Sequence, residues 1–397
     1  MSFLTKALRS TAFSVLFAFG LVMGSIVHAL AVPQLLVDMQ TGEVLYETDA
    51  GVPWHPASLT KLMTALLAFE AIEQGAVQLS TPVVTTANAL RVAPSKMGFP
   101  VDTAITLEDA LYLLIVKSAN DIAVAIGETV AGSETEFVAL MNRRAAEMGL
   151  TATHFVNPHG LHDPAQVTSA RDMAIIALTI RARYSRFNAI FNTQTVEHGQ
   201  SRSHTNNVLL ARFAGTNGMK TGYVCASGLN IVATAERGGR HLMAVTLGAS
   251  SARERGEMTA QLLFSGFAGG YRGTGQTVVS LPNRAGLAPV DMRRNICGAD
   301  AAQYNEARAE EFPVGLEGQL SYLTDTIEPP VHRMAVLGRL RDVPLPRPRP
   351  DDFILEPSLA AIGAPGIPPR DFGDGTPGAA VVAGELNIPL PRPRPVF

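Results

Sequence analysis

The chain has 397 residues, of which 47% are hydrophobic and 17% are charged, so it can bury a substantial core and is not disordered throughout. Its 32 basic and 35 acidic side chains give a formal net charge of −3, so the chain has no overall positive charge that would attract nucleic acid. Two cysteines without a CxxC pair exclude a disulfide scaffold and a cysteine-built zinc site. We expect a folded protein with no nucleic-acid partner and no cofactor.

Residues 1–31 have the pattern of a secretory signal peptide. Lys6 and Arg9 precede an apolar run over residues 12–27, and Ala29-Leu30-Ala31 matches an A-x-A cleavage site. The run is shorter than the roughly 20 residues that a spanning helix needs, which favours removal over retention. We therefore expect export across the inner membrane and a mature protein in the periplasm or cell envelope.

Residues 32–273 carry strand and helix patterns that predict one domain. A hairpin is expected at 34–46, and a long helix opens at Ser58 and ends at Gly75. Further helices are predicted at 106–116, 121–131, 134–148 and 169–180, and strands at 218–224, 229–235 and 241–247. A tight turn at 237–240 joins the last two strands, and a helix at 254–267 follows. This order predicts an α/β (α+β) fold with helices packed on an antiparallel sheet.

The rest of the chain changes character twice. Short β-like runs at 277–281 and 334–338 predict a small β-rich domain over residues 274–342. Residues 343–397 contain 13 of the 26 prolines, and the octapeptide at 343–350 recurs almost unchanged at 388–395. This composition predicts an extended Pro/Arg-rich arm that acts as a spacer, with weak contact to envelope polymers or the membrane surface as the alternative.

The first of three short motifs is Ser58-Leu59-Thr60-Lys61, at the start of the long helix. Residues i and i+3 share a helix face, so the Ser58 hydroxyl and the Lys61 amine can touch. A partly desolvated lysine can take the serine proton, and the N–H groups at the helix start can hold an oxyanion. The alternative is an N-cap serine followed by a solvated lysine.

Ser118-Ala119-Asn120 and Lys220-Thr221-Gly222 are the second and third motifs. A hydroxyl and a carboxamide in a loop between helices can relay a proton and orient an amide, although a helix-capping loop uses the same residues. A cation and a hydroxyl beside a glycine on a strand suit an extended peptide whose carboxylate lies at the Lys-Thr end, although an ordinary edge strand explains them too.

Taken together, the three motifs favour a catalytic site. Their order is the set found in penicillin-binding proteins and serine β-lactamases, with S-x-N in the position of S-D-N. The chain holds 27 arginines and only five lysines, yet two of the four lysines after residue 31 fall in these motifs. Arginine does not deprotonate in proteins, so an arginine in place of Lys61 could not act as a general base.

Residues 33–267 resemble the D-alanyl-D-alanine carboxypeptidases, the low-molecular-weight penicillin-binding proteins. The resemblance is carried by ASLTKLMT at 57–64, KSANDIA at 117–123, NPHGL at 157–161 and GMKTG at 218–222. It implies a serine hydrolase that removes the terminal D-Ala from peptidoglycan stem peptides through an acyl-enzyme. It also implies covalent inhibition by β-lactam antibiotics.

The resemblance assigns roles to individual residues. Ser58 would be the nucleophile, Lys61 its base, and Ser118 the proton relay to the departing D-Ala. The backbone N–H groups of Ser58 and Tyr223 would hold the oxyanion. The substrate-binding set would comprise Asn120, His159, Lys220, Thr221, Gly222, Tyr223 and Arg255, with Arg253 as the alternative to Arg255 and His159 expected to line the cleft.

Three alternative functions remain open at this point. A β-lactamase would use a glutamate to deacylate, but residues 151–180 contain no Glu and only Asp163 and Asp172 as acids. A D-Ala-diaminopimelate endopeptidase is chemically closer, and the motifs do not distinguish it from a carboxypeptidase. A non-catalytic peptidoglycan-binding module would be expected to have lost some of the motif residues, all of which are intact.

Two further features invite a functional interpretation. His154, His159 and His162 lie within nine residues, but no carboxylate or cysteine completes a known ligand spacing, so we expect no metal. Cys225 and Cys297 could pair in an oxidising compartment, and the sequence leaves this open.

Overall fold

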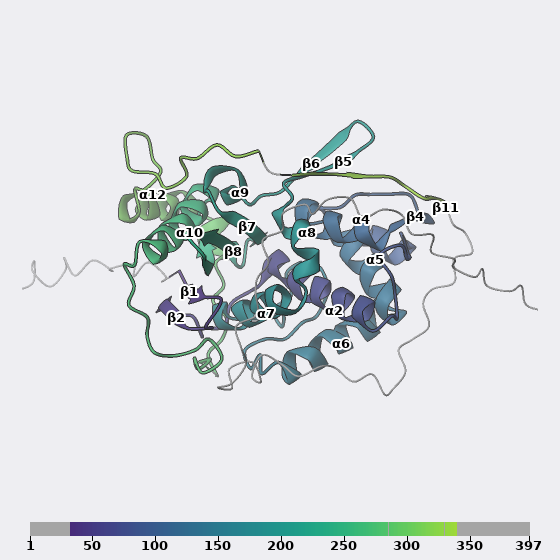
Figure 1. The fold of residues 1–397 in the computed structure, drawn as a ribbon, viewed down its shortest axis with the longest axis horizontal. Coiled ribbons are helices and arrows are strands. Elements are labelled where there is room, and N and C mark those ends of the chain that lie inside the picture. Colours follow the sequence, from purple (N-terminus) through teal and green to yellow (C-terminus); the bar gives the residue numbers. More distant parts are fainter. Residues whose placement is uncertain (1–31, 285, 329, 340–397) are drawn as a thin grey trace, which may run out of the picture.

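The structure, a computed structural model, describes residues 32–284, 286–328 and 330–339. A five-stranded sheet with its helices lies beside a cluster of helices (Figure 1). The predicted signal peptide at 1–31 and the predicted arm at 343–397 fall outside the described residues. Within the described ranges, no helix is long and apolar enough to cross a membrane.

The main sheet has the strand order β2-β1-β9-β8-β7, and every neighbouring pair is antiparallel. Gly238 and Gly239, with φ of 58° and 75°, form the tight turn between β8 and β9 that the sequence predicts. β7 is an edge strand, so no further strand of this sheet covers its outer side. The strands are β1 (Gln34–Asp38), β2 (Val44–Thr48), β7 (Thr216–Val224), β8 (Gly228–Arg237) and β9 (Arg240–Ala249).

The helices predicted at 121–131, 134–148, 169–180 and 254–267 are present to within three residues. The helix predicted at 106–116 is an α-helix continued by a π-helix, and the short helices at 87–91, 188–192 and 209–212 were not predicted. The predicted helix at Ser58 begins instead at Lys61, after a 3-10 turn. The helices are α2 (Lys61–Glu73), α3 (Ala87–Arg91), α4 (Leu107–Tyr112), α5 (Asn120–Ala131), α6 (Glu134–Glu147), α7 (Ala170–Arg183), α8 (Asn188–Asn192), α9 (Leu209–Arg212) and α10 (Ala252–Phe267). Shorter turns are the 3-10 helices η1 (Ala57–Thr60) and η3 (Ser185–Phe187) and the π-helix η2 (Leu113–Lys117).

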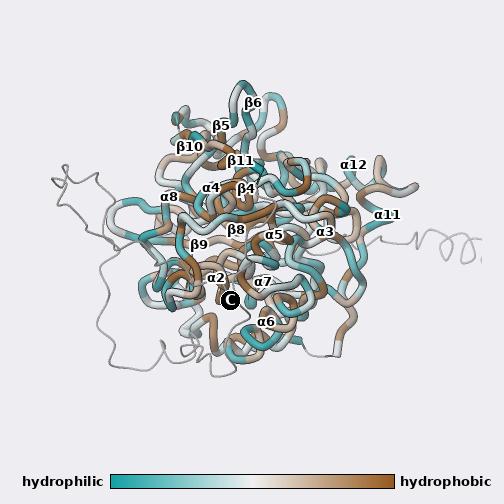
Figure 2. Tube along the Cα trace, turned by 90° about the vertical axis from the view of Figure 1, so that its right-hand side faces the viewer, coloured by the Kyte–Doolittle hydropathy of each residue, from teal (hydrophilic) through white to brown (hydrophobic). Residues whose placement is uncertain are grey.

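Alternating side chains divide the central strands between two apolar clusters. On β8, Ile231 and Ala233 pack with residues of α9 and α10. Val232 between them belongs to the larger cluster, which contains residues of α2 and α7. α2 is buried over almost its whole length, as expected of a helix that is apolar on all sides. Figure 2 shows brown, hydrophobic segments inside and teal, hydrophilic segments at the periphery.

Two small sheets complete the fold, with the orders β10-β5-β6 and β11-β4-β3. In both, a short C-terminal strand pairs with a strand from much earlier in the chain. The strands are β3 (Pro82–Val84), β4 (Thr103–Thr106), β5 (Thr195–His198), β6 (Ser201–His204), β10 (Val331–Met334) and β11 (Gly338–Arg339).

The small β-rich domain expected at 274–342 is not what the described part of this segment forms. Its longest element is a helix, α12 (Ala301–Glu311), which follows the short α11 (Arg293–Ile296). The run at 277–281 contributes one isolated bridge to Glu43, and β10 and β11 join the edges of other sheets across the top of Figure 1. Strands of two to four residues cannot form a stable sheet alone, so they add to existing edges.

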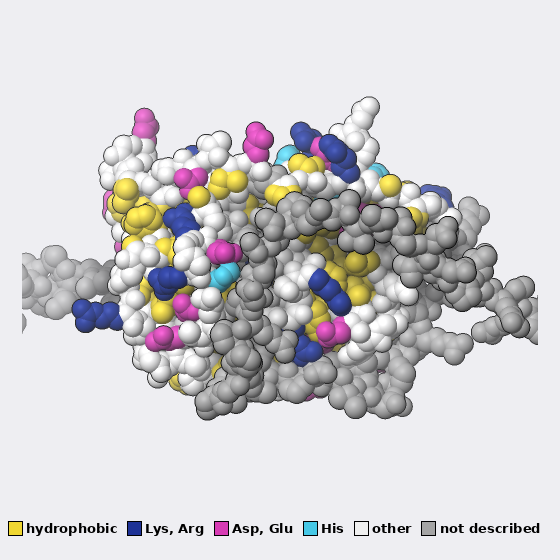
Figure 3. Space-filling view, in the orientation of Figure 1, with side chains coloured by type: hydrophobic (Ala, Val, Ile, Leu, Met, Phe, Trp, Pro, Cys, Tyr) yellow, Lys and Arg dark blue, Asp and Glu magenta, His cyan; other side chains and the backbone are white. Residues whose placement is uncertain are grey.

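Charged side chains of both signs are interspersed over the face seen in Figure 3. This face carries no large field of one sign, in keeping with the net charge of −3. The part of this face that is visible in Figure 3 therefore gives no sign of a broad polyanion-binding surface.

Candidate active site

Ser58 lies in the 3-10 turn through which the chain enters α2. Ala57 before it has φ of 48°, in the left-handed region that is strained for any residue except glycine. The Thr60 hydroxyl donates to the Ala57 carbonyl at 2.8 Å. The 157–161 loop packs closely against the same oxygen, so that a Cβ on Gly160 would lie only 1.9 Å from it. These contacts fix the turn that presents Ser58.

Lys61 is fully buried, with its Nζ 3.0 Å from Ser58 Oγ. The amine also donates to Asn120 Oδ1 at 2.7 Å and to the His159 carbonyl at 2.5 Å. Both of these oxygens can only accept hydrogen bonds. A neutral Lys61 therefore places two N–H bonds on them and directs its lone pair at the Ser58 hydroxyl.

The buried position of Lys61 favours the neutral amine. Burial is the main cause of a Lys61 pKa well below the usual range, and the nearby Lys220 lowers this pKa further. Asp121 acts in the opposite direction. The Asp121 carboxylate is buried and accepts hydrogen bonds from the backbone N–H groups of Met97 and Gly98, at 3.0 and 2.8 Å. A lysine whose pKa is lowered in this way can serve as a general base.

Ser118 and Asn120 lie where η2 ends and α5 begins. Ser118 adopts a left-handed conformation, with φ of 60° and ψ of 36°. Its Oγ is buried and has no hydrogen-bond partner among the described residues, so it is available to a substrate group. The Asn120 carboxamide accepts from Lys61 and donates to the Ala93 carbonyl at 2.9 Å, which fixes its orientation.

Strand β7 brings Lys220, Thr221 and Gly222 to the other side of Ser58. A Cβ on Gly222 would lie 3.0 Å from the Ser58 backbone nitrogen, so glycine permits the close approach of β7 to the turn that carries Ser58. Lys220 is buried and donates to the Thr221 carbonyl at 2.8 Å. Burial, and then the charge of Arg255, lower the pKa of Lys220 to about 7.

Arg255, on α10, adds a second buried cation beside Thr221. One of its terminal nitrogens donates to the Asn206 carbonyl at 2.7 Å, whereas its Nε has no hydrogen-bond partner among the described residues. Burial lowers the pKa of Arg255 to about 10, so it stays charged. Arg253 instead donates to the carbonyls of Phe312 and Val314 and does not line the cleft. A cation pair of this kind suits a carboxylate.

These groups meet in one cleft of about 390 Å³. Seven of the residues singled out from the sequence line it, namely Ser58, Ser118, Asn120, Thr221, Gly222, Tyr223 and Arg255. Lys61 and Lys220 are buried beneath its surface. The remaining lining residues are Pro94, Ser95, Lys117, Gly160, Leu161, Asn206, Val224, Leu229 and Ala252.

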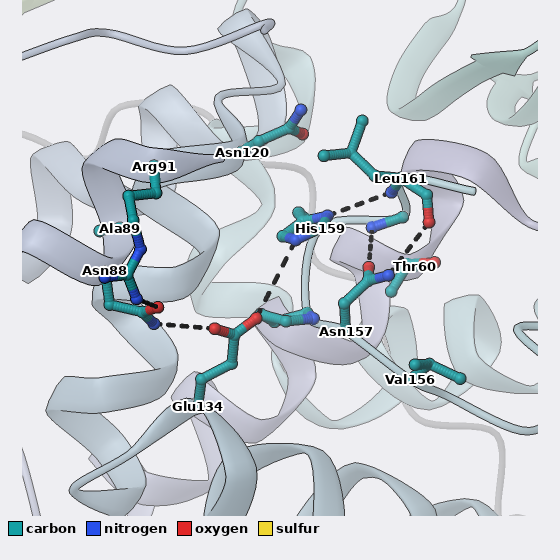
Figure 4. Close-up of polar contacts among 12 residues, drawn as sticks. Thr60, Asn88, Ala89, Arg91, Asn120, Glu134, Val156, Asn157, His159 and Leu161 are labelled. Carbon is teal, nitrogen blue, oxygen red and sulfur yellow. Dashed lines mark hydrogen bonds and ion pairs between the residues drawn. The ribbon is translucent and has the colours of Figure 1, made fainter. Parts of the chain in front are cut away.

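The His159 side chain lies behind the cleft wall, and its neighbours Gly160 and Leu161 line the cleft in its place (Figure 4). Its Nδ1 accepts from the Leu161 N–H at 3.1 Å, and its Nε2 lies 4.0 Å from a Glu134 oxygen. Burial, and then Lys61, lower the pKa of His159 to about 3, so the ring is neutral. His159 contacts the site through its backbone carbonyl, which accepts a hydrogen bond from Lys61, because its ring lies on the far side of the loop.

Sequence reasoning missed the residues that support the cleft walls. Asp121 anchors the loop that carries Ser95, and its position directly after S-x-N was the only available signal. Gln166 Oε1 accepts from the N–H groups of Val156 and Asn157, both at 2.9 Å, and so holds the 157–161 loop. No sequence pattern indicates that role for Gln166.

The three clustered histidines point to different places. His154 forms a backbone bridge with Val167, His159 faces Glu134, and the His162 ring packs edge-on against His55 at 4.8 Å. No group of three or more His, Cys, Asp or Glu side chains within the described residues is arranged to hold a metal ion.

The two cysteines pair. Cys225, just after β7, forms a disulfide with Cys297, which follows α11. The cross-link joins the rim of the cleft to the segment in which the sequence predicted a separate domain.

The sequence profile of the D-alanyl-D-alanine carboxypeptidase family (peptidase family S11) matches residues 27–251. The chain belongs to this family. It is 34% identical over 233 residues to the carboxypeptidase DacF of Bacillus subtilis, and 33% identical over 240 residues to DacC of Escherichia coli. These alignments cover 58% and 59% of the chain and 60% of each relative, so the chain spans about three fifths of the length of these curated relatives.

Solved structures of penicillin-binding proteins have a similar fold. Penicillin-binding protein 5 of Haemophilus influenzae matches with a TM-score of 0.57 and 32% identity, over 59% of this chain and 70% of that one. Penicillin-binding protein D2 of Listeria monocytogenes, solved in a cefotaxime-bound form, matches with a TM-score of 0.54 and 26% identity, over 59% of this chain and 96% of that one. The predicted fold class, a penicillin-binding-protein-like sheet flanked by helices, is confirmed.

Proposed function

We propose that this protein is a serine D-Ala-D-Ala carboxypeptidase that trims peptidoglycan stem peptides and is acylated by β-lactams. One observation carries the proposal: a buried Lys61 amine lies 3.0 Å from the Ser58 hydroxyl and also contacts two carbonyl oxygens, those of the Asn120 side chain and the His159 backbone. This arrangement supplies an activated nucleophile in a cleft that Arg255 lines and that Lys220 underlies.

The reaction would begin with transfer of the Ser58 proton to Lys61 and attack of Oγ on the carbonyl between the two D-Ala residues. The N–H groups of Ser58 and Tyr223 would receive the oxyanion. The C–N bond then breaks, and the departing D-Ala amine takes up a proton through Ser118, whose Oγ has no partner among the described residues. Water hydrolyses the acyl-enzyme and restores Ser58.

The substrate would be positioned through its terminal carboxylate. Lys220 and Arg255 provide the charge, and Thr221 a hydroxyl, on the side of the cleft formed by β7 and α10. Asn120 would orient the substrate amide. A carboxypeptidase needs such a site because its substrate ends in a free carboxylate next to the scissile bond.

A β-lactam acyl-enzyme should persist. Asp163 and Asp172 are the only acids in the sequence between residues 151 and 180, and the Asp172 carboxylate already accepts hydrogen bonds from Thr153, at 2.8 Å, and Arg171, at 2.7 Å. No carboxylate lines the cleft within the described residues. Slow hydrolysis, and hence inhibition rather than lactamase turnover, is the expected behaviour.

Incubation with a stem pentapeptide tests the proposal, because a carboxypeptidase releases free D-Ala and leaves a tetrapeptide. A cross-linked muropeptide in a parallel reaction would reveal endopeptidase cleavage. Labelling with a fluorescent penicillin should give a covalent band that Ser58→Ala abolishes. A wild-type protein that takes no label and releases no D-Ala would leave a non-catalytic wall-binding module.

The envelope location is part of the same proposal. The signal pattern at residues 1–31 and the location of peptidoglycan outside the cytoplasmic membrane support it. The Pro/Arg-rich residues 343–397 are proposed as a spacer, and their removal by limited proteolysis should leave D-Ala release intact. N-terminal sequencing of the exported protein should begin at residue 32.

A further inference from the structure

Tyr223 lines the cleft and also touches the disulfide. The side chain is half-exposed, and its hydroxyl lies 3.1 Å from Cys297 Sγ and 3.9 Å from Cys225 Sγ. The two sulfurs are bonded to each other, so the tyrosine is the donor in these contacts. Tyr223 thus extends from the cleft to the covalent link between the end of β7 and the C-terminal segment.

The disulfide is one of several attachments at this rim. The Met292 N–H donates to the Ala226 carbonyl at 3.0 Å, and the Met292 side chain is buried. α11 follows Met292 and leads directly to Cys297. The segment around α11 is therefore fastened to the loop after β7 by a backbone hydrogen bond, a buried side chain and the disulfide. It supports the cleft wall at Tyr223.

The order of groups along β7 determines which part of a substrate meets Tyr223. The proposed function places the terminal carboxylate near Thr221 and the scissile carbonyl at Ser58, beside Gly222. Residues i and i+2 of a strand lie on the same face, roughly 7 Å apart. Tyr223 is therefore displaced from Thr221 toward the acyl side of the scissile bond, where the residue before the D-Ala-D-Ala pair would lie.

We propose that Tyr223, braced by the Cys225–Cys297 disulfide, is a specificity-determining residue for the side chain that precedes D-Ala-D-Ala. An aromatic face provides apolar surface for a long aliphatic chain, such as that of a diamino acid, and little for a methyl group. This inference rests on the proposed function and adds a substrate preference to it.

Two peptides with the same free terminal carboxylate and with uncharged side chains isolate the contact: acetyl-L-Ala-D-Ala-D-Ala and Nα,Nε-diacetyl-L-Lys-D-Ala-D-Ala. The release of D-Ala gives kcat and KM for each, and the wild type should prefer the longer side chain. Tyr223→Ala should reduce the ratio of the two kcat/KM values by about three- to tenfold, mainly through KM of the lysine peptide. Tyr223→Phe, the matched control, should keep more of the preference because it keeps the ring.

The disulfide is tested separately with Cys225→Ser/Cys297→Ser, and with wild-type protein reduced by a phosphine. Both should lose part of the preference, because the ring is no longer braced. An unchanged ratio in Tyr223→Ala would overturn the proposal. A ratio lost in Tyr223→Ala but kept without the disulfide would overturn the bracing role.

The failure of this inference differs from the failure of the proposed function. A wild type that releases D-Ala from neither peptide contradicts the carboxypeptidase activity itself. A wild type that cleaves both peptides without preference contradicts only the role of Tyr223. If the double serine variant does not fold, as judged by circular dichroism, Tyr223→Ala with the disulfide intact still decides the specificity claim.

Discussion

Replacing Asn120 with aspartate places a carboxylate where an amide oxygen now lies 2.7 Å from the Lys61 amine. At an effective dielectric constant of about 20, a full charge at that distance stabilises protonated Lys61 by about 6 kcal/mol. The change is nearly isosteric, but the pKa of Lys61 rises. Because the base must be neutral to accept the Ser58 proton, acylation at pH 7 should fall roughly 10³- to 10⁴-fold in Asn120→Asp.

The assay is the second-order rate constant for acylation by a fluorescent penicillin, measured across pH. In Asn120→Asp the acid limb of this profile should move to higher pH, and part of the lost rate should return as pH rises. Asn120→Ala, the matched control, removes the acceptor without adding a charge and should not move the limb upward. A lower plateau with an unmoved limb in Asn120→Asp would refute the assignment of Lys61 as the base.

Three further predictions concern the loop, the carboxylate site and the C-terminal segment. Gly160→Ala drives a Cβ into backbone at a φ of 91°, so it should displace the loop carbonyl from the lysine base and slow penicillin acylation by about a hundredfold. Lys220, with a pKa of about 7, is charged below that pH and neutral above it, so KM for a D-Ala-D-Ala peptide should rise as the pH passes 7. Arg255→Gln removes a neighbouring positive charge that lowers the pKa of Lys220, so this variant should show the rise in KM at a higher pH. Arg308→Met breaks the 2.8 Å contact to the buried Glu254 and should cost about 3–5 kcal/mol in the free energy of unfolding, measured by urea denaturation.

Each of these predictions has a control or a contradicting result. Gly238→Ala has a similar positive φ but open space around the new Cβ, so it should acylate normally. A flat KM between pH 5.5 and 8.5 would contradict a titrating Lys220 in the carboxylate site. Arg294→Met removes a solvent-exposed ion pair with Asp300 and should leave the urea midpoint unchanged. Equal midpoints for Arg308→Met and wild type would show that α12 is not integrated into the fold.

The main elements of the fold could be predicted because their signals are local. The i, i+3 spacing of Ser58 and Lys61 and the two glycines between β8 and β9 depend on residues adjacent in sequence. The order of strand, helices and strands was sufficient to indicate a sheet with flanking helices.

The remaining features depend on partners far away in the chain. The runs at 277–281 and 334–338 were expected to belong to a separate β-rich domain, whereas the strands found in that segment, β10 and β11, pair with β5 and β4, which lie more than a hundred residues earlier. His159, in the NPHGL segment, faces Glu134 because the conformation of its loop turns the ring away from the cleft. The spacing of apolar residues in the sequence carries no information about such a loop conformation. The sequence left the cysteine pairing open for the same reason, since 72 residues separate Cys225 from Cys297.

The central claim is that Lys61 is a neutral base, and its titration tests this most directly. The chain contains only five lysines, so ¹³Cε-lysine labelling gives a spectrum simple enough to follow by NMR from pH 5 to 11. Lys61→Arg, which lacks one resonance, assigns the signal. The account predicts that the Lys61 resonance titrates well below the ordinary range of lysine side chains. A Lys61 resonance that titrates near pH 10.5 would contradict it.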